Sequence, residues 1–136
     1  MDLIEAYKNT RYKISKLNLE IRIGEHFEHL DELLLEHNAK SWAFITPYNP
    51  ESQILSDQEN EARFELLKEE VKDYTVFEGE GVGADVSWPA EKSLLILGID
   101  RSEAERIGKH FKQNAIVFGA ILGLAELIVL NERLKN

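Results

Sequence analysis

The sequence contains no cysteine among its 136 residues. This absence excludes disulfide bonds, thiolate nucleophiles and thiolate metal ligands as sources of stability or chemistry. No signal-peptide pattern is visible at the start of the chain. Both observations are typical of a protein in a reducing compartment, so we expect a cytoplasmic location.

Positive charge is also scarce, because 16 lysine and arginine residues face 25 acidic residues, giving a formal net charge of −9. Such a chain repels the phosphate backbone, so nucleic acid is not an expected partner. The longest apolar stretch, residues 115–130, is interrupted by Glu126 and is shorter than the roughly 18 to 20 residues that cross a bilayer. We expect no membrane association, and interpret the stretch as two buried strands joined at residues 119–123.

Recognisable catalytic and ligand-binding motifs are missing as well. There is no nucleophile elbow and no paired-carboxylate signature. The glycine-rich stretch GEGVG at 79–83 has no helix start after it, as a phosphate loop requires, so we expect a flexible hairpin loop. His26 and His29 have helical spacing but no indicated third ligand, which favours a solvated helix face over a zinc site. No metal and no cofactor are predicted, and catalysis stays an open question.

Hydrophobic periodicity predicts an α/β (α+β) two-layer sandwich. Period-two alternation and short apolar runs indicate strands at 9–14, 18–24, 41–46, 94–99 and 125–130, with others beginning at 75 and near 115. Helical spacing indicates helices at 26–38, 57–72 and from about 100 to 111. We predict a mixed sheet of five or six strands covered mainly on one face by these three helices.

The order of elements from about residue 41 to 121 is strand, helix, strand, strand, helix, strand. This order is that of a ferredoxin-like split βαβ core. The length, and the lack of repeats or long linkers, favour a single domain over residues 1–136.

The predicted helix at 57–72 brings two polar side chains toward its buried stripe. Asn60 and Arg63 fall on or beside the face that carries Phe64 and Leu67. An inward arginine needs a carboxylate or an anionic ligand, because an unpaired buried charge is costly. Asn49, in the preceding turn, either bonds its own backbone or joins them. These three residues therefore form either a structural cluster or an anion site.

A second group of polar residues flanks the strand at 94–99. Glu91 and Ser93 precede this strand, whereas Gln113 and Asn114 follow the third helix. In a split βαβ unit these positions lie near one another. The carboxamides of Gln113 and Asn114 either hydrogen-bond Glu91 and Ser93, satisfy the last carbonyls of the helix, or do both. The group is then either a structural network of buried polar side chains or a ligand site.

The same topology separates the two groups. It places the cluster of Asn49, Asn60 and Arg63 at the opposite end of the sheet, about 20 Å from the second group for a six-residue strand. Thr10 or Tyr12 can join either group if the first strand crosses the sheet edge. The sequence thus predicts two separate clusters.

Six motifs follow one another along the chain: YKNTRY, LEIRIGEH, ITPYNPES, ENEARFELL, WPAEKSLLILG and FKQNAIVFG. In their order and spacing the chain resembles an uncharacterised bacterial family, domain of unknown function 3293, from roughly residue 7 to residue 128. The resemblance implies a compact domain and supports the choice of polar positions. It implies no reaction.

The function is unknown from the sequence, and two hypotheses remain. The first is a domain that binds a small polar or anionic molecule through one of the polar groups. The alternative is a protein-interaction module that pairs with itself or with another chain through a sheet edge or the C-terminal hairpin. A monomer and a homodimer are both compatible with the sequence.

Overall fold

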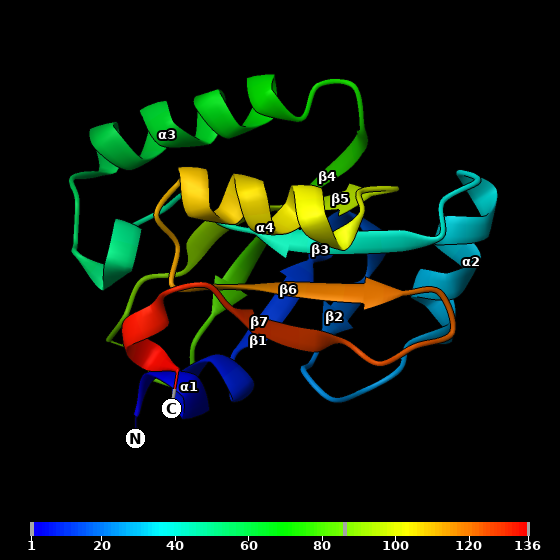
Figure 1. The fold of residues 1–136 in the computed structure, drawn as a ribbon, viewed down its shortest axis with the longest axis horizontal. Coiled ribbons are helices and arrows are strands. Elements are labelled where there is room, and N and C mark those ends of the chain that lie inside the picture. The colour runs from blue at the N-terminus through cyan, green and yellow to red at the C-terminus, as the bar shows by residue number, and fades with distance from the viewer. Residues whose placement is uncertain (1, 86, 136) are drawn as a thin grey trace.

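The structure is a computed structural model that describes residues 2–85 and 87–135 (Figure 1). The helices of this part are α1 (Leu3–Lys8), α2 (Glu28–Glu36), α3 (Asp57–Glu70) and α4 (Arg101–His110), with short 3-10 helices η1 (Ser15–Leu17), η2 (Pro50–Ser52) and η3 (Glu132–Leu134). The strands are β1 (Arg11–Ile14), β2 (Leu19–Ile21), β3 (Ser41–Ile45), β4 (Thr75–Val82), β5 (Glu91–Leu97), β6 (Ala115–Ala120) and β7 (Glu126–Val129).

The α+β class is confirmed, but the predicted numbers of elements were wrong. The sheet has seven strands instead of five or six, since all seven segments with a strand pattern join it, including β1 and β2, which span only four and three residues. Four α-helices replace the predicted three. Helix α1 was missed because its six residues are too few to show a helical period; the side chain of Asp2 caps it by accepting from the backbone N–H of Glu5.

The strand order is β2-β1-β4-β5-β3-β6-β7, and every neighbouring pair of strands is antiparallel. The prediction of a mixed sheet was therefore wrong. The helical crossovers do join strands that run in the same direction, β3 to β4 and β5 to β6. These strands do not pair with each other, because β5 lies between β3 and β4, and β3 lies between β5 and β6.

Helices cover both faces of the sheet, contrary to the prediction of mainly one. Leu67 of α3 and Ile107 of α4 belong to a buried cluster with Ile96 of β5. Leu34 of α2 belongs to a second cluster with Leu95, the next residue of β5. Figure 1 shows α3 and α4 together on one side of the sheet, with α1 and α2 away from them. Because successive strand residues point to opposite faces, the apolar run of β5 supplies both clusters.

The glycine-rich stretch at 79–83 is mostly strand, so the predicted flexible hairpin loop was wrong. Strand β4 continues to Val82 because it is paired on both sides, with β1 and with β5. Gly79 fits only without a side chain, since a Cβ atom there would lie 2.6 Å from the carbonyl oxygen of Lys13. Pairing with two flanking strands thus stabilises the extended conformation that the glycine residues themselves do not favour.

The apolar stretch at 115–130 forms β6 and β7, as expected. Within the described residues, no helix has both the length and the apolar character needed to span a membrane.

Candidate functional site

The predicted polar residues meet at one end of the sheet. Strand β3 ends where β5 begins, since the two are antiparallel with Ile45 opposite Leu94. Strand β6 is parallel to β5 and begins at this end too, so the residues after α4 arrive there. The prediction of two clusters about 20 Å apart was wrong because it placed the end of β3 and the start of β5 at opposite ends.

One hydrogen bond joins the two predicted clusters directly. The amide Nδ2 of Asn49 donates to Oε2 of Glu91 at 2.8 Å. This contact lies at the edge of a cavity of about 650 Å³ on the face of the sheet that carries Phe44. We call this cavity the Glu91 pocket. Its walls come from α1, from all the described strands except β2, and from the loops after β3, β4 and α4.

Glycine in β4 leaves the floor of the Glu91 pocket hollow. Gly81 lies between Tyr12 of β1 and Glu91 of β5 in the register of the sheet. A Cβ atom at Gly81 would have as its nearest neighbour Thr10 Cγ2 at 3.7 Å, an ordinary van der Waals contact. The space above this row of the sheet is therefore open, and a longer side chain at position 81 would fill part of the pocket.

Glu91 is the central charged group of the pocket. Its Oε2 atom accepts from Asn49 and, at 3.3 Å, from Nε1 of Trp88. Burial raises the pKa of Glu91, and the bonds from Asn49 and Trp88 offset part of this rise. Within residues 2–85 and 87–135, no lysine, arginine or histidine nitrogen lies within 4.0 Å of the carboxylate.

Asn49 is fixed by a reciprocal pair with Asn60. The backbone N–H of Asn49 donates to Asn60 Oδ1, and Asn60 Nδ2 donates to Asn49 Oδ1, both at 2.9 Å. The backbone N–H of Leu55 also donates to Asn49 Oδ1 at 3.0 Å. Because a backbone N–H must meet an oxygen, this bond assigns the amide orientation of Asn49 and directs Nδ2 at Glu91. Asn60, only 3% exposed, therefore holds Asn49 in the orientation in which it donates to Glu91.

Arg63 bonds to backbone carbonyl oxygens and not to the carboxylate expected as its structural partner. Its Nε atom donates to the carbonyl oxygen of Pro47 at 2.6 Å, and Nη2 donates to the carbonyl oxygen of Phe111. The guanidinium also lies 5.6 Å from the centre of the Phe111 ring. None of the described carboxylates forms an ion pair with it. Arg63 thus ties the loop after β3 to the end of α4.

The carboxamides of Gln113 and Asn114 hold the same loop from the other side. Gln113 Nε2 donates to the carbonyl oxygens of Tyr48, at 3.0 Å, and of Phe111. Asn114 Nδ2 donates to Ser52 Oγ at 3.0 Å. Gln113 also lines the pocket, whereas Asn114 is not among its lining residues. The contacts expected between these carboxamides and Glu91 or Ser93 do not form; Ser93, also in the wall, donates to the carbonyl of Glu91.

The loop after β3 has an unusual backbone conformation. Asn49, Glu51 and Ser52 have φ values of 45°, 51° and 63°, in the left-handed region that non-glycine residues seldom adopt. The backbone N–H of Glu51 donates to the carbonyl of Lys112, which helps to hold this shape. Such strain persists only where the surroundings determine it, and it is common at binding sites.

Aromatic residues of the pocket were largely missed from the sequence. Tyr7 comes from α1, which has too few residues to be predicted, and Trp88 comes from the loop after β4. Tyr12 and Phe44 complete the aromatic lining, and the Tyr12 hydroxyl donates to the carbonyl of Tyr7 at 2.8 Å. Burial raises the pKa of Tyr7, while hydrogen bonds to Asn114 and Ser52 partly lower it. The sequence signal for these residues is the YKNTRY motif at 7–12, which contains Tyr7, Thr10 and Tyr12.

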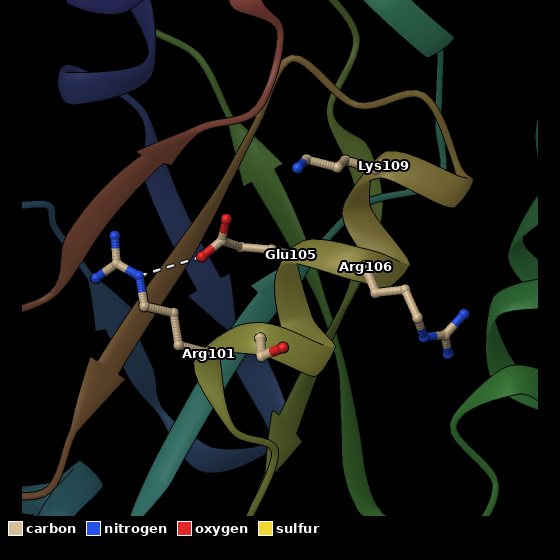
Figure 2. Close-up of a pocket in the computed structure, with 5 residues that line it drawn as sticks. Arg101, Glu105, Arg106 and Lys109 are labelled. Atoms are coloured by element: carbon tan, nitrogen blue, oxygen red, sulfur yellow. Dashed lines mark hydrogen bonds and ion pairs between the residues drawn. The ribbon is translucent and has the colours of Figure 1, made fainter.

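A second depression lies on the outer surface of α4, lined by Arg101, Ser102, Glu105, Arg106 and Lys109 (Figure 2). Arg101 pairs with Glu105 at 3.2 Å, and Arg106 pairs with Glu70 at 3.1 Å. Figure 2 shows Arg101 and Arg106 pointing in different directions. Paired, diverging side chains on a helix surface are typical of solvated ion pairs, so we do not treat this depression as the site.

His26, which precedes α2, and His29 of α2 belong to no metal-binding group among the described residues. His26 contacts Asp31, and no group of three or more potential ligands occurs in the described ranges.

The comparison with family models decides the family. Residues 45–116 match the model of a protein of unknown function, DUF3293. The chain belongs to the DUF3293 family. The matched segment runs from the end of β3 into β6 and includes Asn49, Asn60, Arg63, Glu91, Ser93, Gln113 and Asn114. It leaves out α1 and β1, so Tyr7 and Tyr12 of the pocket lie outside the match. No curated protein and no solved structure matches the chain.

Proposed function

We propose that this DUF3293 protein binds a small polar molecule in the Glu91 pocket. The observation that carries the proposal is a partly buried carboxylate, that of Glu91, held by Asn49 and Trp88 at the wall of a cavity of about 650 Å³. This volume lies within the roughly 300–1,000 Å³ that is usual for small-molecule sites. A cavity with apolar walls and a few fixed polar groups is the usual form of such a site.

The candidate residues have different roles under this proposal. Glu91, Ser93 and Gln113 line the cavity and are proposed to contact the ligand. Asn49 both lines it and orients Glu91. Asn60, Arg63 and Asn114 are positioning residues, because their hydrogen bonds go to the loop after β3 and to the end of α4.

A thermal-shift screen of metabolites tests the proposal. A ligand at about 100 times its dissociation constant stabilises the folded state by roughly 2.7 kcal/mol, which is easily seen as a raised melting temperature. The blocking variant is Gly81→Leu, which places a side chain in the part of the pocket beside Glu91. The matched control is Thr75→Leu, an exposed position at the other end of β4.

We expect hits on the wild type and on Thr75→Leu, and loss of the same hits on folded Gly81→Leu. Hits that survive on Gly81→Leu place the ligand elsewhere and overturn the proposal, as does a screen without any hit.

The alternative, an interaction module, is favoured by one observation. Leu122 and Leu124, in the turn between β6 and β7, are 78% and 60% exposed. In contrast, Ile128 and Leu130 of the same hairpin are buried, 5% and 6% exposed, so charges there would disrupt the core. A double variant, Leu122→Asp with Leu124→Asp, should abolish any dimer seen by light scattering. A wild-type monomer at high concentration removes this support for self-association.

Two finer features belong to the same proposal. A ferredoxin-like core over about residues 41 to 121 is supported by the order β4-β5-β3-β6 with both crossover helices on one face. A cytoplasmic location is supported by the cysteine-free sequence.

A further inference from the structure

The charged side chains that line the Glu91 pocket are all acidic. Its ionisable acidic lining residues are Glu91 and Asp85, and the described residues of its wall include no lysine, arginine or histidine. Asp85 is exposed and accepts from the backbone N–H of Ser87 at 2.9 Å. Glu91 is the group that burial affects, so an occupant of the pocket meets a partly desolvated carboxylate.

The sheet geometry prevents the protein from neutralising Glu91 with its nearest lysine. Lys92 follows Glu91 in β5, and successive strand residues point to opposite faces. Lys92 accordingly pairs with Glu61 of α3, with the ammonium and carboxylate atoms 2.5 Å apart. Arg63 is also engaged, by backbone carbonyls. Partial burial of a carboxylate that has only neutral donors costs free energy, and a cation beside it would offset that cost.

The aromatic residues of the pocket favour the same kind of occupant. Tyr7, Tyr12, Phe44 and Trp88 line it together, and Trp88 is hydrogen-bonded to Glu91 itself. The faces of aromatic rings attract ammonium and guanidinium groups, tryptophan most strongly. A carboxylate with aromatic neighbours is thus suited to an organic cation.

We propose that the natural ligand of the Glu91 pocket carries an amine, amidine or guanidine group whose positive charge pairs with the carboxylate of Glu91. This inference rests on the proposed binding function and names its ligand class. An anionic ligand, which the sequence left open, would face repulsion from Glu91 and no described cation in the wall.

The test compares benzamidine with benzamide, which have nearly the same shape but differ in charge. Their affinities are measured by isothermal titration calorimetry at neutral pH. Bonds to a charged group are stronger than bonds to a neutral one by an amount that corresponds to about tenfold in affinity. We expect benzamidine to bind the wild type about tenfold more tightly than benzamide.

The informative variant is Glu91→Gln, which keeps an acceptor for Asn49 and Trp88 but removes the charge. It should bind both probes equally. The matched control is Glu36→Gln, an exposed position on α2, which makes the same change in net charge and should keep the tenfold preference. Lowering the pH through the raised pKa of Glu91 should weaken benzamidine binding in the wild type and not in Glu91→Gln.

Different failures overturn different claims. Equal binding of the two probes to the wild type, or a preference that survives in Glu91→Gln, overturns the inference but leaves the pocket as a binding site. The inference also fails if the metabolite hits that Gly81→Leu abolishes carry no amine, amidine or guanidine group. If neither the probes nor the screen give binding, the proposed function falls together with the inference.

Discussion

Replacing Asn60 with alanine should destabilise the protein substantially, although no ligand or charge is removed. The side chain is 3% exposed and makes two hydrogen bonds with Asn49 at 2.9 Å. Alanine would leave the backbone N–H of Asn49 without this acceptor in a partly buried loop. An unsatisfied buried donor costs about 1–3 kcal/mol and the second lost bond about 1 kcal/mol.

The favourable helix propensity of alanine returns a few tenths of a kcal/mol. The net loss in the free energy of unfolding is therefore about 2–3 kcal/mol, a large share of the ~5–15 kcal/mol that a domain possesses. With a urea m-value of about 2 kcal/mol per molar, the middle of the usual range, the unfolding midpoint should fall by about 1–1.5 M. Urea titration followed by far-UV circular dichroism measures this shift.

Gln58→Ala is the matched control, because Gln58 is an exposed amide of the same helix. Its midpoint should change little, by an amount equivalent to about 0.5 kcal/mol or less. If Asn60→Ala and Gln58→Ala unfold at the same urea concentration, the Asn49–Asn60 pair does not stabilise the loop, and the role given to Asn60 is refuted.

Asn60→Asp provides an independent check on the direction of the hydrogen bonds. The donor Nδ2 would become an oxygen facing Asn49 Oδ1, now 2.9 Å away. Repulsion and burial should destabilise this variant at neutral pH. Its stability relative to the wild type should recover as the pH falls, because a protonated aspartate can donate where the amide did. A relative stability that does not change with pH would contradict the assigned orientation.

Three further predictions concern the frame of the site. Gly79→Ala should lower the free energy of unfolding by about 1–3 kcal/mol through overpacking against the Lys13 carbonyl oxygen. Gly81→Ala, where the methyl group has room, should change it little. Equal unfolding midpoints of the two variants in urea would show that a small backbone shift relieves the close contact at Gly79. Arg63→Ala should lower the free energy of unfolding by about 2 kcal/mol, because two charge-assisted hydrogen bonds are lost. Arg63→Lys should restore only part of this loss, since one ammonium group cannot reach both the Pro47 and Phe111 carbonyl oxygens as the guanidinium does. Full restoration by lysine would show that only the charge matters. Burial raises the pKa of Glu91 in the folded state, so the protonated carboxyl favours folding below the unfolded-state pKa of about 4.3, and this contribution is lost as the pH rises through the folded-state pKa. Glu91→Gln should therefore gain stability relative to the wild type as the pH rises from the unfolded-state pKa through the folded-state pKa. A gain that does not depend on pH would contradict the raised pKa of Glu91.

The sequence determined most of the elements, because their signals are local. Hydrophobic spacing identified α2, α3 and α4, and apolar runs identified β3 and β5 as strands buried on both faces. The same spacing correctly placed Asn60 on the buried stripe of α3. A side chain's direction on a helix depends only on the 3.6-residue period, so this prediction needed no knowledge of the rest of the fold.

Where the polar groups meet was decided by the tertiary structure alone. The sequence could select Asn49, Glu91 and Gln113 as unusual polar positions, but their convergence depends on the antiparallel order of β3, β5 and β6. Strand order is a matter of pairing between distant segments, and a single strand direction assigned wrongly moves a residue to the other end of the sheet.

The hollow of the Glu91 pocket is likewise a tertiary property. Glycine at positions 79 and 81 looked like a flexible loop, because local preference cannot show that β1 and β5 pair with this segment on both sides. The six-residue helix α1, which supplies Tyr7, also gives too short a pattern to be recognised. The amino-acid sequence by itself therefore determined which polar groups are available and which faces of the helices they occupy, whereas only long-range strand pairing decided that they surround a single cavity.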